Sequence, residues 1–243
     1  MKNKIEKLAY LTIDDAPVEN IESKLDFLKI YNIKAIWFCT GESIKKYPHE
    51  AVKILEQGHI IGNHSMSHAN FAELSIEKAK EEILSTDKLI ESVYKQAGMQ
   101  RKAKYFRFPY LNNGDNEDFT KTDWNNTHVA AIQKILQEAG YNQKGINAIN
   151  HFWYKESGLD KAFSVSCTYD TFDWQIGNKS YEHSSLKDVL AAMTDKKSIQ
   201  SRTLGDMQTR EIIMMHAWTK DPDFKKILES LMAMGIKFVF PDL

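Results

Sequence analysis

The chain has 243 residues, 42% of them hydrophobic, and its 32 Lys and Arg nearly balance 33 Asp and Glu to leave a net charge of −1. α/β barrels of about 200 to 250 residues commonly form one domain, so we expect a single domain over residues 1–243. The lack of a dense basic cluster argues against a nucleic acid partner. No apolar run reaches the about 18 residues that a membrane span needs.

The segment Met1–Lys7 carries positive charge, but no apolar region follows it, so the sequence shows no signal peptide. As written, the chain is expected to be cytoplasmic, and it would be extracytoplasmic if a leader had been removed. Cys39 and Cys167 each lie in an apolar segment, which favours two buried thiols over a disulfide.

Short apolar runs alternate with amphipathic segments along the chain. The runs that predict strands are 8–13, 35–39, 59–61, 104–106, 163–167, 211–215 and 236–239. Helical spacing of apolar residues predicts helices over 20–30, 48–57, 75–97, 129–139, 186–193 and 221–234. This alternation predicts an α/β fold with a parallel sheet, which we expect to form a distorted (β/α) barrel of seven strands.

Two irregular stretches between Leu111 and Lys161 are longer than the usual connections of about 4 to 6 residues. We expect them to be inserted loops at the C-terminal face of the barrel, where they would wall a cleft. Trp124, Trp153 or Tyr154 would then either offer a flat face to a sugar ring or anchor the loop itself.

Two histidines follow the predicted strand 59–61. His64 and His68 are four residues apart, a spacing that brings both rings to one side of a helical turn or tight loop, within reach of one metal ion. On that spacing alone, hydrogen-bonded surface histidines are the more common outcome.

Other charged residues directly follow four of the remaining predicted strands. They are Asp14, Asp15, Arg107, Asp173 and His216. In a barrel of parallel strands, the C-terminal strand ends gather on one face. We therefore expect these five side chains and the two histidines to meet in one site.

Five short motifs appear in order along the chain, and they are Thr12–Pro17, His64–His68, Arg107–Tyr110, Asp170–Trp174 and Met214–His216. In these motifs the sequence resembles the polysaccharide deacetylase family, the NodB homology domain of carbohydrate esterase family 4. The family patterns are T-F-D-D-G-P, H-S-x-x-H, R-x-P-Y, D-x-x-D-W and L-x-H. The resemblance covers nearly the whole chain.

Two glycines of the family pattern are replaced in this chain, by Ala16 and by Leu111, and the inserts are longer than expected. These departures leave every reacting group in place. They alter the walls of the cleft.

The resemblance implies one divalent metal ion, bound by Asp15, His64 and His68. Two imidazoles and one carboxylate suit zinc best, and cobalt, nickel or manganese is also compatible. Such an ion lowers the pKa of a bound water to about 7, which supplies a nucleophile at neutral pH.

The resemblance also implies roles for the other matched residues. The implied catalytic residues are Asp14 as general base, Arg107 as its orienting partner, His216 as general acid, Asp173 as the group that adjusts the pKa of His216, and Tyr110, whose backbone N–H holds the oxyanion. The implied substrate-binding residues are Trp174, Met214 and Tyr110, the first two lining the pocket for the acetyl methyl group.

The implied activity is the metal-dependent removal of N-acetyl groups from amino-sugar polymers or oligomers, such as chitin-type or peptidoglycan-type glycans, with release of acetate. A general acid and a general base each contribute roughly 10² to 10⁴-fold to such a reaction. Two alternatives keep the same residues. One is turnover of O-acetyl esters or of a non-sugar amide, and the other is a carbohydrate-binding protein that has lost turnover.

Overall fold

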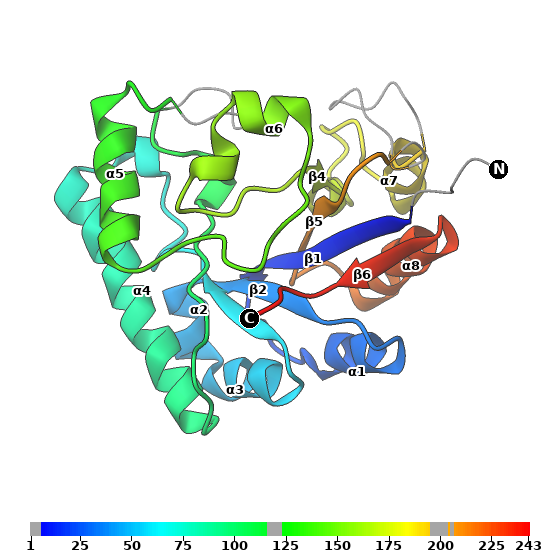
Figure 1. Ribbon diagram of the computed structural model, residues 1–243. Helices are drawn as coiled ribbons and strands as arrows, with labels where there is room; N and C mark the ends of the chain where they lie inside the picture. The colour runs from blue at the N-terminus through cyan, green and yellow to red at the C-terminus, as the bar shows by residue number, and fades with distance from the viewer. Residues whose placement is uncertain (1–5, 116–122, 195–203, 205–206) are drawn as a thin grey trace.

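The computed structural model describes residues 6–115, 123–194, 204 and 207–243, and a parallel β-sheet lies at its centre (Figure 1). The six strands found among these residues are β1 (Lys7–Ala16), β2 (Ala35–Cys39), β3 (Ile60–Asn63), β4 (Tyr169–Asp170), β5 (Glu211–His216) and β6 (Ile236–Val239). Their order is β3-β2-β1-β5-β4, and β6 pairs with the first half of β1. All pairs are parallel, so the carboxyl ends of the strands share one edge.

The central strand β1 is apolar on both of its faces. Ala9, Leu11 and Ile13 belong to the core between the sheet and the helices that cover it, whereas Tyr10 packs in a second cluster on the other face. A run that is apolar on both faces is typical of a parallel strand buried on both sides. The predicted α/β fold with a parallel sheet is thus confirmed.

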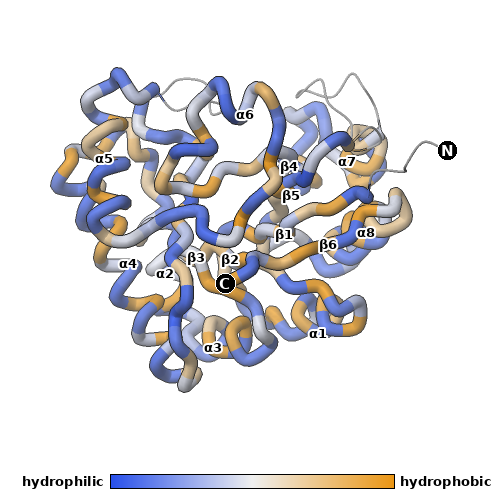
Figure 2. Tube along the Cα trace, in the orientation of Figure 1, coloured by the Kyte–Doolittle hydropathy of each residue, from blue (hydrophilic) through white to orange (hydrophobic). Residues whose placement is uncertain are grey.

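Helices surround the sheet, and orange and blue segments alternate along them in Figure 2, as expected for amphipathic helices that lie on a core. In the described part of the chain they are α1 (Glu22–Ile30), α2 (Gly41–Lys46), α3 (Pro48–Glu56), α4 (Ile76–Gln96), α5 (Thr127–Glu138), α6 (Phe152–Glu156), α7 (Leu186–Ala192) and α8 (Asp221–Ala233). The six predicted helices are confirmed, whereas the short helices α2 and α6 were not predicted.

We expected seven strands, and the described residues contain six. One difference is the predicted strand 104–106. It contributes a single bridge, between Asn63 and Phe106. The ammonium group of Lys104 instead pairs with Asp87 of α4 at 2.7 Å. The segment therefore meets β3 only around Asn63, whose N–H donates to the Tyr105 carbonyl (2.8 Å) and whose carbonyl accepts the N–H of Arg107 (2.9 Å).

The predicted strand 163–167 is the other difference, because the chain joins β5 only from Thr168 onward. The N–H of Val165 donates to the Phe106 carbonyl (2.7 Å), whereas the N–H of Thr168 donates to the Ile212 carbonyl in β5 (2.9 Å). The strand that forms is β4, two residues beyond the predicted run. Backbone hydrogen bonds thus link the chain between β3 and β5 without a regular seventh strand.

The insert at 142–161 lies at the amino ends of the strands, not at the C-terminal face as expected. Tyr10, near the start of β1, donates its hydroxyl to the Gly145 carbonyl (3.2 Å). Tyr154 of α6 is buried in the same apolar cluster as Tyr10, and Trp153 packs against that cluster. These two aromatic side chains therefore anchor the insert.

Other expectations concern the cysteines and the membrane. Cys39 and Cys167 are both buried and are not joined in a disulfide, as expected. Among the described residues, no helix combines the length and the apolar character that crossing a membrane requires.

We expect the substitution Gly62→Ala to destabilise the sheet. A Cβ atom at this position would lie 2.6 Å from Cδ1 of Phe38, a fully buried ring that pairs with Gly62 across β2 and β3. Overpacking of this kind costs about 1–3 kcal/mol of unfolding free energy, measurable by urea denaturation. The cost should shrink in a Phe38→Leu background, and equal costs in both backgrounds would contradict the clash.

Candidate metal centre and active site

Two adjacent acids at the end of β1 face the same cleft because the strand stops alternating there. Asp15 has a φ of 61°, and the register between β1 and β2 shifts between Ile13 and Ala16. Successive side chains of a regular strand point to opposite faces. The break turns both Asp14 and Asp15 into one cleft, inside the strand rather than beyond its end as predicted.

The histidine loop, residues 64–68, directly follows β3 and is held from one side by the start of α2. The N–H of Gly41 donates to the Ser65 carbonyl, and the N–H of Glu42 donates to the Met66 carbonyl, both at 2.9 Å. These amides belong to the first turn of α2, where N–H groups have no partner within the helix. The helix therefore fixes the loop through otherwise unpaired donors.

From the other side, α4 holds the histidine loop through one carboxylate. Glu82 accepts hydrogen bonds from the N–H of Met66, from the N–H of Ser67 and from the Ser67 hydroxyl, each at 2.8 Å. Asn63 adds a further contact, since its side-chain oxygen accepts the N–H of Ser65 (2.8 Å). The backbone between the two histidines is thus clamped by helix-borne and strand-borne groups.

Three candidate metal ligands meet beside this loop. Ligand atoms of Asp15, His64 and His68 all lie within 4.8 Å of one another. Oδ1 of Asp15 is 3.2 Å from Nε2 of His68 and 3.6 Å from Nε2 of His64. Two imidazole nitrogens and one carboxylate oxygen are a donor set that divalent transition metals prefer.

The protonation of the two imidazoles fits this role. Nδ1 of His64 lies 2.8 Å from the Arg107 carbonyl, which can only accept, so Nδ1 carries a proton and Nε2 is the nitrogen on the side of Asp15. Burial and the neighbouring His64 lower the pKa of His68, against the opposing effect of Asp15. Both rings thus place Nε2 beside Asp15, and the lowered pKa of His68 favours its neutral, metal-binding form.

Asp14 is held by a buried arginine. The guanidinium of Arg107 donates to Oδ1 of Asp14 (2.8 Å) and to the Thr12 hydroxyl (2.7 Å), and its Nε donates to the Val165 carbonyl (3.0 Å). It also stacks on Phe38, 4.4 Å from the ring centroid. Arg107 thus lies behind Asp14 and fixes one oxygen of that carboxylate, while the other oxygen, Oδ2, lies 3.9 Å from Nε2 of His64.

His216 ends β5 and is held by Asp173 through two hydrogen bonds. Nδ1 of His216 lies 2.9 Å from Oδ1 of Asp173, and the backbone N–H of His216 donates to Oδ2 (2.8 Å), which also accepts the Thr219 hydroxyl. Burial alone lowers the pKa of His216, but the Asp173 carboxylate outweighs it and raises this pKa to about 10. The imidazole is therefore protonated at neutral pH.

These groups line a cleft of about 640 Å³ at the carboxyl ends of the strands. Of the residues predicted for the site, those that line the cleft are Asp14, Asp15, His64, His68, Tyr110, Trp174, Met214 and His216. Arg107 and Asp173 lie behind Asp14 and His216. Trp124, Trp153 and Tyr154 do not line it, and residues 116–122 of the insert lie outside the described residues.

The motif residue Asp170 orients one wall of the cleft. Its carboxylate accepts the N–H of Phe172 (2.8 Å) and the indole N–H of Trp174 (3.0 Å). Burial raises the pKa of Asp170 to about 6. The two acids of this motif therefore have different partners: Asp170 holds Trp174, and Asp173 holds His216.

Several residues at the cleft were not predicted. Trp218 donates its indole N–H to Oδ2 of Asp15 (2.9 Å), and Phe172, Gln175 and Tyr181 add to the wall. The only signal for Trp218 was its position two residues after His216. The other wall residues, like Glu82 on α4, carry no local signal because their contacts arise from the fold.

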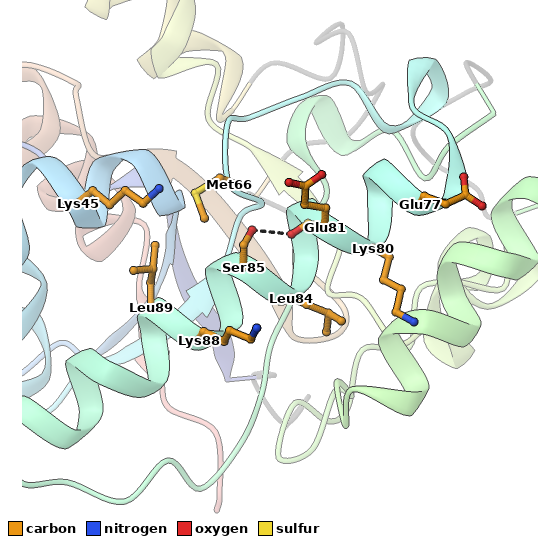
Figure 3. Close-up of a pocket in the computed structure, with 9 residues that line it drawn as sticks. All are labelled: Lys45, Met66, Glu77, Lys80, Glu81, Leu84, Ser85, Lys88 and Leu89. Atoms are coloured by element: carbon orange, nitrogen blue, oxygen red, sulfur yellow. Dashed lines mark hydrogen bonds between the residues drawn. The ribbon is translucent and has the colours of Figure 1, made fainter.

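A separate groove of about 560 Å³ lies behind the histidine loop, between α2 and α4 (Figure 3). Met66 of the loop and Leu89 of α4 are among its lining residues. Met66 packs closely there because position 41 is glycine, where a Cβ atom would lie 2.3 Å from the Met66 sulfur. The loop is thus anchored on this side and presents its imidazoles on the other.

The fold and the site define an α/β protein whose sheet carries, at its carboxyl edge, a candidate metal centre, a carboxylate held by arginine and a protonated histidine. The family model described as "Polysaccharide deacetylase" matches residues 1–135, more than half of the chain. The chain belongs to the polysaccharide deacetylase family, and the resemblance found in the motifs is confirmed.

Several curated relatives match parts of the chain. Two peptidoglycan-N-acetylglucosamine deacetylases of Bacillus cereus are 36% identical over 101 residues and 34% identical over 139 residues, covering 41% and 56% of this chain. A peptidoglycan-N-acetylmuramic acid deacetylase of Bacillus subtilis is 35% identical over 89 residues, 36% of this chain. The matched segments span 35%, 54% and 19% of these relatives' own lengths.

Solved structures share the fold over almost the whole chain. A family 4 carbohydrate esterase from Streptomyces lividans, in complex with acetate, aligns with a TM-score of 0.63 at 18% identity, covering 96% of this chain and 92% of that one. A CE4 family pseudoenzyme from Bacillus anthracis aligns with a TM-score of 0.61 at 20% identity, covering 96% and 63%. At these identities the likeness concerns the fold.

We expect Glu82→Ala to loosen the histidine loop. The substitution leaves the N–H groups of Met66 and Ser67 without their acceptor, which costs about 1–3 kcal/mol. Amide hydrogen exchange at these two residues should accelerate. The neighbouring Glu81→Ala is the control, because Glu81 is exposed and pairs with Lys78, and similar exchange in both variants would contradict the clamp.

We expect the stabilisation by His216 to depend on pH. Because its pKa is raised from 6.5 to about 10, the stabilisation is fully present below pH 6.5 and is lost as the pH rises through about 10. The difference in unfolding free energy between wild type and His216→Gln, measured without metal, should shrink by about 1.5–3 kcal/mol over this range. A difference that is constant between pH 6 and pH 10 would refute the charged pair.

Proposed function

We propose that this protein is a metal-dependent deacetylase that removes N-acetyl groups from amino-sugar polymers or oligomers and releases acetate. The observation that carries the proposal is the meeting, in one cleft, of three candidate metal ligands, a carboxylate held by arginine and a protonated histidine. Amide hydrolysis requires these functions together, because the attacking water must lose a proton and the leaving amine must gain one.

Asp15, His64 and His68 would hold the metal, and zinc suits this donor set best, with cobalt, nickel or manganese also compatible. When bound, such an ion supplies Lewis acidity toward water and toward a carbonyl oxygen. The proton on Nδ1 of His64 and the lowered pKa of His68 support this assignment.

The chain's own residues then move the protons. Asp14, with one oxygen held by Arg107, takes the proton of the water that attacks the acetyl carbonyl carbon. The C–N bond breaks as His216, kept protonated by Asp173, gives its proton to the amine nitrogen. Each of these transfers contributes roughly 10² to 10⁴-fold.

Three further residues complete the proposed site. The backbone N–H of Tyr110 would donate to the oxyanion, an interaction that contributes about 10² to 10³-fold in other hydrolases. Tyr110 has a φ of 56°, and its ring lies 4.6 Å from that of His68, so it stands beside the ligands. Trp174 and Met214, which line the cleft, would contact the acetyl methyl group.

The substrate class follows from the relatives. The Bacillus relatives described above are named as deacetylases of N-acetylglucosamine or N-acetylmuramic acid in peptidoglycan. We therefore propose that the substrate is an N-acetylated glycan of the peptidoglycan or chitin type. The intact hydrogen bonds of Asp14 and His216 favour turnover over mere carbohydrate binding, since binding a sugar requires neither a base nor an acid.

We expect Asp14→Asn to reduce acetate release by about 10² to 10⁴-fold while leaving zinc affinity within a few fold, because Asp14 is a base and not a ligand. Acetate release from chitooligosaccharides and peptidoglycan fragments, with O-acetylated sugars compared in parallel, measures the reaction. Asp26→Asn, at an exposed position of α1, is the matched control. Full activity after complete metal removal would refute the mechanism, and faster turnover of the O-acetyl sugars would reassign the substrate.

A further inference from the structure

Trp218 joins the turn after β5 to the end of β1. The backbone N–H of Ala217 donates to the Asp14 carbonyl (2.8 Å), which holds the turn against β1. The indole N–H of Trp218 then donates to Oδ2 of Asp15 (2.9 Å). The side chain is 47% exposed, so burial alone does not fix its position. The hydrogen bond to Asp15 is the directional contact that orients it.

This contact divides the two oxygens of the Asp15 carboxylate. Oδ1 faces the imidazoles, at 3.2 Å from Nε2 of His68 and 3.6 Å from Nε2 of His64. Oδ2 is engaged by the indole. A carboxylate held in this way offers one oxygen to a cation, whereas an unrestrained carboxylate can offer both.

Trp218 also lines a second hollow. This hollow, of about 410 Å³, lies toward α2 and shares Asp15, His68 and Trp218 with the cleft. On the side of the cleft, the indole ring of Trp218 lies 5.3 Å from the imidazole ring of His216. Removing the indole would leave Oδ2 of Asp15 without this hydrogen-bond donor.

We propose that Trp218 is a positioning residue that holds Asp15 as a one-oxygen ligand and thereby makes the site selective for zinc over oxygen-seeking ions such as manganese. This inference rests on the proposed function in one respect, that Asp15, His64 and His68 bind a metal. Two imidazoles and a single carboxylate oxygen suit the low coordination number of zinc, whereas manganese accepts additional oxygen ligands.

The test measures zinc and manganese affinities of the metal-stripped protein by competition with a chromogenic chelator, in the absence of substrate. Trp218→Phe keeps an aromatic ring and removes the N–H, and Trp218→Gln supplies an amide donor without the ring. Trp124→Phe is the control, since Trp124 is similarly exposed and lies away from the cleft. Circular dichroism of each variant checks the fold.

In Trp218→Phe we expect zinc affinity to fall about 10 to 100-fold, as for other groups that orient metal ligands, and manganese affinity to fall less. Trp218→Gln should recover part of the zinc affinity, and Trp124→Phe should match wild type. Wild-type zinc affinity in Trp218→Phe, or no recovery in Trp218→Gln, would overturn the inference. Because no substrate is present, these outcomes are independent of deacetylation, whose failure would appear as zinc binding without acetate release.

Discussion

The parallel register of β1 against its neighbours is the constraint on which the candidate site depends. It sets Asp14 opposite His216 on one side and Ala16 opposite Cys39 on the other. Cys39 in turn lies opposite Asn63, the residue before His64. Side chains about two hundred residues apart in the chain therefore lie next to one another at the carboxyl edge of the sheet. A shift of one residue in this register would turn side chains to the other face.

Once the strands have placed these side chains, local partners decide what each histidine can do. His68 is partly buried among other imidazoles, and its lowered pKa keeps it neutral, as a metal ligand must be. His216 is also largely buried, but Asp173 raises its pKa to about 10 and keeps it charged, as a proton donor must be. The two imidazoles thus differ within one cleft because burial and His64 outweigh Asp15 at His68, whereas Asp173 outweighs burial at His216.

The sequence predicted the helices and the groups that follow strand ends, because periodicity and motif spacing are local properties. It did not predict where the long insert lies. An aromatic residue such as Tyr154 could either contact a sugar or anchor the insert. Its burial in the apolar cluster that contains Tyr10 shows that it anchors the insert. The run 104–106 is similarly ambiguous, since so short a run cannot reveal that it bridges to β3 only between Phe106 and Asn63. What was missed depends on partners distant in the chain.

The two departures from the family pattern have different physical consequences. At position 16 the left-handed conformation falls on Asp15 instead, so Ala16 needs no glycine-like freedom, and it is fully buried at the end of β1. Leu111 itself adopts a φ of 55°, which costs a branched residue on the order of 1–2 kcal/mol. Its side chain lines the cleft, and Tyr110 before it is also left-handed. The strain therefore lies in the wall of the cleft, so the change at position 111 alters that wall, whereas the change at position 16 is buried and does not.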